Sequence, residues 1–199
     1  MDIKQQEEAL EFFKGHAPEW RKKAESLSDS KVNVIKQRND YVIDVLKSLD
    51  NHKSFLDVGC GTGELTCDAA QIVEKSIGVD YADTMIELAN QKKEMLRLMN
   101  TDFFCSSIFD MDLSSLNLSS VAANGFIEYI SLDEIDEFFK LVFESLTVGG
   151  SFMVGSRNRL FNLFSLNQFT SDELIQSQYQ ILLNEAISLS NSPTIDEIL

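Results

Sequence analysis

Three glycines at alternate positions separate a short apolar segment from a segment with helical character. The apolar segment is residues 53–58, and the glycines are Gly59, Gly61 and Gly63. Glycine adopts backbone conformations that other residues avoid, and its missing Cβ atom lets a ligand approach the main chain. The first turn of a helix also presents N–H groups that lack partners within the helix. The pattern indicates a ligand-binding loop, with a tight strand-to-helix turn as the alternative.

Asp80 supports the ligand-binding interpretation. It ends a second apolar run, residues 76–80, after the glycine-rich segment. In dinucleotide-binding folds, an acidic side chain near this position hydrogen-bonds the ribose hydroxyls. Taken alone, an aspartate here is more simply explained as a helix N-cap or a solvated loop residue. The glycines and Asp80 together favour a ligand that contains a nucleoside.

Strand-like and helix-like segments alternate from residue 53 onward. Short apolar runs predict strands at residues 53–58, 76–80, 102–105, 121–124 and 151–155. Helical periodicity predicts helices at residues 64–73, 82–98, 133–146 and 171–190, with Gly149 and Gly150 as a stop after the third. Before these we expect helices at residues 2–14, 19–27 and 31–49, broken at Gly15 and with Pro18 in a first turn. This order predicts an α/β fold of three layers, with a mostly parallel sheet whose loops converge at one edge.

Composition excludes several classes of protein. The chain has 199 residues and a formal net charge of −15, which argues against a nucleic-acid partner. No apolar run approaches the roughly 20 residues of a membrane helix, and the polar N-terminus does not resemble a secretory signal. The three cysteines, Cys60, Cys67 and Cys105, have no metal-ligand spacing and are expected to be reduced thiols. We therefore expect a cytoplasmic protein with no metal site and no membrane partner.

Four segments resemble, in order, the motifs of the class I S-adenosylmethionine (SAM)-dependent methyltransferases. Residues 55–63 are similar to motif I of that family, and residues 78–85 to its second motif. Residues 124–130 and 146–152 are similar to the segments after the fourth strand and before the fifth. The resemblance implies a Rossmann-like fold that binds SAM and releases S-adenosylhomocysteine (SAH). Glycines at 59, 61 and 63 also differ from the Gly-x-Gly-x-x-Gly spacing of nicotinamide sites.

The resemblance implies a role for each matched residue. Asp57 would orient the loop or bind the ammonium group of SAM, Asp80 would hold the ribose, and Tyr81 would pack on the adenine. Ser107 stands where the family often has an acid, so we expect that contact to be weakened or replaced by one from Asp110. The expected cofactor contacts are Arg38, Asp57, Gly59, Cys60, Gly61, Gly63, Asp80, Tyr81, Ser107, Ile108 and Asn124.

The catalytic residues are less well defined. Residues 38–42 are similar to a stretch of the ubiquinone-biosynthesis type of O-methyltransferase, in which an arginine pairs with the SAM carboxylate. A guanidinium suits that anion, and a solvated helix charge is an equal alternative for Arg38.

Glu128 and Tyr129 stand where those enzymes have Glu-His, and tyrosine is a poor base at neutral pH. His16 is a further candidate base, although a polar surface role suits it better.

The acceptor side is expected to involve both ends of the chain. We expect residues 1–50 to form a helical lid over a SAM-binding domain at residues 51–199, with Trp20 as a candidate acceptor contact. After Lys140, the only basic residues are Arg157 and Arg159, which follow the last predicted strand. They are either ordinary surface charges or contacts to an acidic acceptor, such as a phosphate- or carboxylate-bearing metabolite or a nucleotide-linked sugar.

The family fold has seven strands, and we find no convincing strand after Gly155. We expect the C-terminal strand pair to be missing or replaced by helices, in a piece of a longer protein or in a variant. A second copy or a neighbouring domain would then cover the sheet edge. The favoured function is a small-molecule methyltransferase of EC class 2.1.1. The alternative is a non-catalytic subunit of the same fold that scaffolds or activates a partner enzyme.

Overall fold

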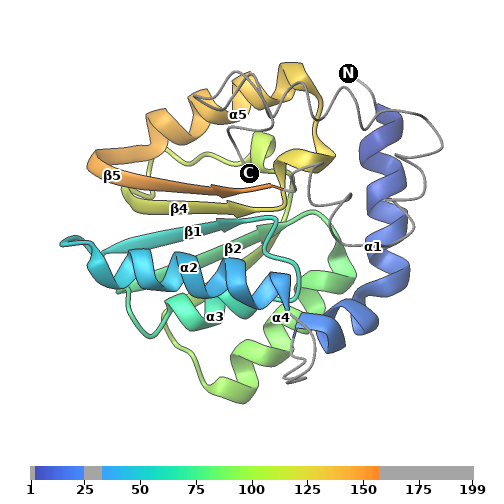
Figure 1. Cartoon of the computed structure of the whole chain (residues 1–199), viewed down its shortest axis with the longest axis horizontal. Coiled ribbons are helices and arrows are strands. Elements are labelled where there is room, and N and C mark those ends of the chain that lie inside the picture. Colours follow the sequence, from blue (N-terminus) through green and yellow to red (C-terminus); the bar gives the residue numbers. More distant parts are fainter. Residues whose placement is uncertain (1–2, 25–32, 157–199) are drawn as a thin grey trace, which may run out of the picture. The chain divides into compact units, whose positions relative to one another are not determined.

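The computed structural model describes residues 3–24 and 33–156, and Figure 1 shows a parallel sheet with helices on both faces. Five strands lie in the order β3-β2-β1-β4-β5, and all neighbours are parallel. The strands are β1 (Ser54–Val58), β2 (Lys75–Asp80), β3 (Thr101–Cys105), β4 (Leu118–Asn124) and β5 (Leu146–Gly155). The helices are α1 (Ile3–Ala24), α2 (Val34–Ser48), α3 (Glu64–Ala69), α4 (Asp83–Leu96) and α5 (Leu132–Ser145), with short 3-10 turns η1 (Ile108–Asp110) and η2 (Ile127–Tyr129). The predicted α/β Rossmann-like fold is confirmed.

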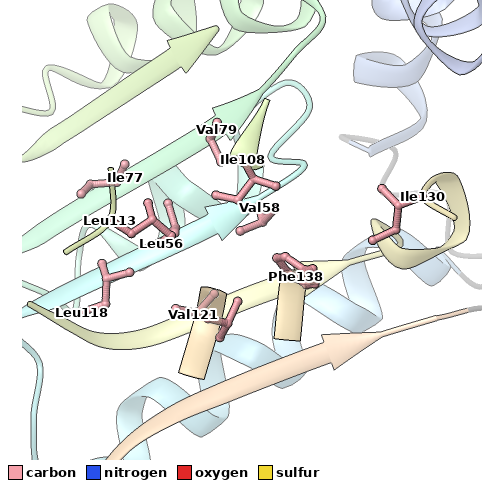
Figure 2. Close-up of a cluster of buried hydrophobic side chains, with 12 residues drawn as sticks. Leu56, Val58, Ile77, Val79, Ile108, Leu113, Leu118, Val121, Ile130 and Phe138 are labelled. Atoms are coloured by element: carbon pink, nitrogen blue, oxygen red, sulfur yellow. The ribbon is translucent and has the colours of Figure 1, made fainter. Parts of the chain in front are cut away.

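Both faces of the sheet carry apolar side chains, which explains why the central strands have continuous apolar runs. Leu56 and Val58 of β1 point to the face that α5 covers, where Phe138 and Val142 pack in the main core cluster (Figure 2). Phe55 points to the opposite face and packs against side chains of α2 and α3. Successive residues of a strand alternate between faces, so one short strand anchors helices on both sides.

Helix α1 corrects one expectation, because it continues through Gly15 and Pro18 without a break. Its apolar residues Leu10, Phe13, Ala17 and Trp20 recur at helical spacing and pack against α4. Ala17 is only 1% exposed and belongs to a cluster with Ala82, which precedes α4, and Met85 of α4. This tertiary packing outweighs the local cost of a glycine and a proline within a helix.

Other differences concern element boundaries. Strand β5 begins at Leu146, directly after α5, so Gly149 and Gly150 lie within the strand and do not separate it from the helix. Helix α3 ends at Ala69, four residues before the expected end at Val73. The predicted helix over residues 171–190 and the question of a C-terminal strand pair lie outside the described residues. The division into a lid over residues 1–50 and a domain over 51–199 stays a prediction.

No helix in the described ranges is long and apolar enough to cross a membrane. The compartment and the absence of a nucleic-acid partner remain predictions.

The ring of Phe103 in β3 packs against both β2 and the glycine loop, residues 59–63. A Cβ atom on Gly78 would lie 2.6 Å from Phe103 Cδ1, and one on Gly63 would lie 2.8 Å from Phe103 Cζ. A Cβ on Gly78 would also lie 2.9 Å from Cys60 Sγ. Real Cβ contacts are longer than this, so glycine at both positions lets the ring pack closely against the main chain.

We expect Gly78→Ala to destabilise the protein by about 1–3 kcal/mol, the usual cost of overpacking a core. Thermal unfolding followed by circular dichroism measures this as a lower Tm. Gly15→Ala is the matched control, because a Cβ there meets nothing within 4 Å and alanine favours a helix. An unchanged Tm for Gly78→Ala would contradict the packing of Phe103 on Gly78.

Candidate functional site

The glycine loop follows β1 at the carboxyl edge of the sheet. Gly59, Gly61 and Gly63 all have positive φ, of 70°, 53° and 81°. The backbone N–H groups of Gly59 and Cys60 both donate to the carbonyl of Val79 in β2. The loop is therefore a left-handed turn that is bonded to the end of the neighbouring strand, and its conformation requires glycine.

Asp80 connects the glycine loop to the start of α4. Its Oδ2 accepts from the Gly61 N–H at 3.0 Å, and its Oδ1 accepts from the Ala82 N–H at 2.9 Å. Burial raises the pKa of the Asp80 carboxyl, while the backbone N–H donors, including those of Ala82 and Gly61, oppose that shift. A carboxylate accepts about four hydrogen bonds, so Asp80 retains capacity for the hydroxyls of a ligand.

Asp57 lies within β1, beneath the loop, and is 3% exposed. The Thr66 hydroxyl in α3 donates to Asp57 Oδ2 at 2.7 Å, so the bond joins the strand before the loop to the helix after it. Burial, together with the nearby acids Asp80 and Glu64, raises the pKa of Asp57 to about 7 against the lowering effect of Thr66.

Arg38 of α2 reaches the ends of β4 and β5. Its Nη2 lies 4.0 Å from Glu128 Oε1 in η2, and both side chains are mostly buried. Asn124, the last residue of β4, donates through Nδ2 to Asn39 Oδ1 at 3.4 Å. The structure thus brings together Arg38, Asn124 and Glu128, which lie far apart in the sequence.

A cavity of about 230 Å³ opens beside these residues, between α2 and the carboxyl ends of β4 and β5. The residues that line it are Gln37, Arg38, Tyr41, Val42, Asn124, Met153, Val154 and Gly155. One of the eight is a cation, and none is acidic. A ligand in this cavity would therefore meet several apolar side chains and the positive charge of Arg38.

Helix α1 lies across the glycine loop, at the ends of the strands (Figure 1). The Trp20 indole nitrogen is 3.6 Å from the point where a Cβ of Gly61 would be. The Phe13 ring makes edge contacts with both Trp20 and Tyr129, so one aromatic cluster links α1 to η2. Tyr81 lies near this cluster, and burial raises its pKa to about 12, with further contributions from Asp80 and Tyr129.

The remaining predicted site residues include both buried and exposed positions. Cys60 is buried in the loop. Ser107 caps η1 through a bond from the Phe109 N–H, and Ile108 is buried in the main core cluster. His16 is on the exposed face of α1, where its Nδ1 lies 2.8 Å from the Phe12 carbonyl oxygen of the same helix. Arg157 and Arg159 lie outside the described residues.

The sequence interpretation missed residues that shape the loop from behind. Phe126 packs on Gly59, 3.3 Å from the position of an added Cβ. Glu64 accepts from Thr62 at 2.6 Å and from Lys92 of α4 at 2.9 Å, so the loop is also tied to α4. The glycines were recognisable in the sequence, but the identity of their distant neighbours was not.

The sequence model of the family described as "Methyltransferase domain" matches residues 49–188. The chain belongs to this family. Among curated proteins, phosphoethanolamine N-methyltransferase 1 of Zea mays is 24% identical over 152 residues, which are 75% of this chain and 30% of that protein. A Geobacillus relative is 28% identical over 124 residues, which are 61% of this chain and 50% of that protein. The chain thus spans half or less of the length of these methyltransferase relatives.

Solved structures agree with the methyltransferase fold. DhpI in a complex with SAM and HEP has a TM-score of 0.61 at 17% identity, covering 84% of this chain and 74% of that one. Magnesium protoporphyrin IX methyltransferase from Synechocystis, with bound SAM, has a TM-score of 0.57 at 19% identity, covering 69% and 70%. Neighbours of this fold therefore include proteins that hold SAM.

The raised pKa of Asp57 predicts a pH-dependent stability. Between about pH 4 and pH 7 the unfolded carboxyl ionises while the folded one keeps its proton, so the free energy of unfolding falls as pH rises, and this fall ends above pH 7. Asp57→Asn removes this contribution and keeps an oxygen that accepts from Thr66. Urea titrations at pH 5 and pH 8 measure the free energy of unfolding of both proteins. From pH 5 to pH 8 this free energy should fall more for the wild-type chain than for the variant. Parallel pH profiles for the two proteins would contradict a raised pKa.

Proposed function

We propose that this methyltransferase domain binds SAM along the glycine loop, Asp80 and Arg38, and transfers its methyl group to a small-molecule acceptor. The observation that carries the proposal is the pair of bonds that Asp80 accepts from Gly61 and Ala82. They place a partly buried carboxylate beside three left-handed glycines, at the edge where open α/β sheets bind ligands.

The described residues fit the chemistry of this cofactor. Asp80 offers carboxylate oxygens to ribose hydroxyls, and the glycine loop offers a main chain that a ligand can approach. Arg38 offers a guanidinium to the carboxylate of the amino-acid part. When bound, SAM supplies an activated methyl group on a positively charged sulfur.

The protein then has mainly to hold the acceptor in line with that methyl group, because positioning supplies much of the acceleration in such transfers. A base is needed only where the acceptor must lose a proton to react. Trp20 and Tyr129 are positioned to exclude water above the loop, since they join α1 to η2 through Phe13.

We propose further that the acceptor carries an anionic group. Arg38 is the one cation among the residues that line the cavity, and none of them is an acid, in a chain of net charge −15. An acceptor anion there would share the five donors of this guanidinium with the SAM carboxylate. The maize relative is named for phosphoethanolamine, a phosphate-bearing metabolite, which supports the same class. The finer resemblance to ubiquinone-type O-methyltransferases stays a proposal.

The second candidate function is a non-catalytic subunit that binds SAM or has lost that ability. The positions of two candidate bases favour this function. Glu128 lies beside Arg38, and His16 lies on the exposed face of α1. Methyl transfer to any acceptor would exclude this alternative.

We expect Asp80→Asn to weaken SAH binding about tenfold or more, since the amide replaces one acceptor oxygen that Gly61 or Ala82 needs. Trp20 is the single tryptophan of the chain and lies against Gly61, so its fluorescence should follow a SAH titration. Asp112→Asn is the control, because Asp112 also accepts from a backbone N–H, that of Ser114, but is exposed. A wild-type chain that binds no SAH by calorimetry would refute the cofactor proposal.

An acceptor panel tests the second proposal. With labelled SAM, we expect methyl transfer to phosphorylated or carboxylated small molecules and little transfer to their neutral analogues. Arg38→Met should bind both SAM and the acceptor less well, whereas Lys47→Met, an exposed residue of the same helix, should not. Turnover confined to neutral acceptors would rule out the anionic class.

A further inference from the structure

Arg38 passes between two glycines at the ends of neighbouring strands. A Cβ on Gly155 would lie 3.8 Å from Arg38 Cδ and 2.5 Å from Asn124 Oδ1, and a Cβ on Gly125 would lie 3.1 Å from Arg38 Nη1. The Gly125 N–H donates to the Gly155 carbonyl at 2.6 Å, which joins the two strand ends. Gly125 therefore leaves room for the guanidinium of Arg38, and Gly155 leaves room for the Asn124 side chain, with the Arg38 stem in ordinary contact beside it.

Glu128 lies at the other end of the guanidinium. The Nη2 to Oε1 distance of 4.0 Å is too long for a hydrogen bond, so the carboxylate acts on Arg38 through charge. The side chains are 25% and 17% exposed, and partial burial makes such an attraction stronger than it is between surface residues. Ser156 donates to the same Oε1 at 3.5 Å, which helps to hold the carboxylate at the end of β5.

We infer that Glu128 is a positioning residue that directs Arg38 toward the Asn124–Gly125 turn, where the carboxylate of the cofactor is received. The inference rests on the proposed function and adds a role that differs from that of a catalytic base. A guanidinium has five N–H donors in a fixed plane, so its orientation decides which of them face a ligand. The Glu128 carboxylate lies near Nη2, and Gly125 leaves room for Nη1 at the turn, so charge and space favour the same orientation of the guanidinium.

Binding of two ligands tests whether Glu128 acts on the carboxylate contact alone. SAH has the amino-acid carboxylate, and 5′-methylthioadenosine has the same adenosine and sulfur without it. We expect Glu128→Gln to raise the Kd for SAH about tenfold, the size of one lost charge-assisted contact, and to leave the Kd for methylthioadenosine unchanged. Arg38→Gln should have the same selective effect. Adding Glu128→Gln to Arg38→Gln should cause no further loss, because residues that act through one another are not additive.

Glu144→Gln is the matched control, since Glu144 is also 4.0 Å from its partner, Lys140, but both side chains are exposed on α5. It should leave both Kd values unchanged. The Nε–H resonance of Arg38, assigned by its loss in Arg38→Gln, should shift in Glu128→Gln and remain in place in Glu144→Gln.

The outcomes are distinguishable. Unchanged SAH binding in Glu128→Gln, or an equal loss for both ligands, would overturn the positioning role while the wild-type chain still binds SAH. A wild-type chain that binds neither ligand would overturn the proposed function and this inference together. An Arg38 resonance that is insensitive to Glu128→Gln would show that the carboxylate does not hold the guanidinium, whatever the cofactor does.

Discussion

The two hydrogen bonds accepted by Asp80 are the constraint on which the rest of the site depends. They come from the glycine loop after β1 and from the first residue before α4, so one carboxylate fixes two crossover connections of the sheet. A movement of the loop away from β2 would leave this partly buried carboxylate with fewer hydrogen bonds, which is unfavourable. The edge of the sheet is therefore held in shape before any ligand arrives.

Small residues make that arrangement possible in two places. Gly63 and Gly78 leave room for the Phe103 ring behind the loop, while Gly125 leaves room for Arg38 and Gly155 for Asn124 at the strand ends. Each pair comes from separate segments of the chain that meet only in the folded protein. The first pair affects the position of the loop. The second affects where the Arg38 side chain, which comes from α2, lies at the end of β4.

The local pattern of the sequence was enough to predict the alternating elements, the parallel sheet and the converging loops. It failed where a distant contact outweighs a local preference. Gly15 and Pro18 disfavour a continuous helix, but Ala17 packs so closely on α4 that α1 continues through them. The proximity of Glu128 and Arg38 likewise depends on how η2 approaches α2, which periodicity and composition do not specify.

The bond between Gly125 and Gly155 also affects how such a site can diverge during evolution. Because this bond joins main-chain atoms, side-chain replacement does not remove it, and a side chain at Gly125 would meet the Arg38 guanidinium. The outer rim of the adjoining cavity is different, since Gln37 and the 68% exposed Tyr41 belong to the surface of α2. Drift or engineering at that rim can change which acceptor enters while the contacts of Arg38 at Gly125 stay the same.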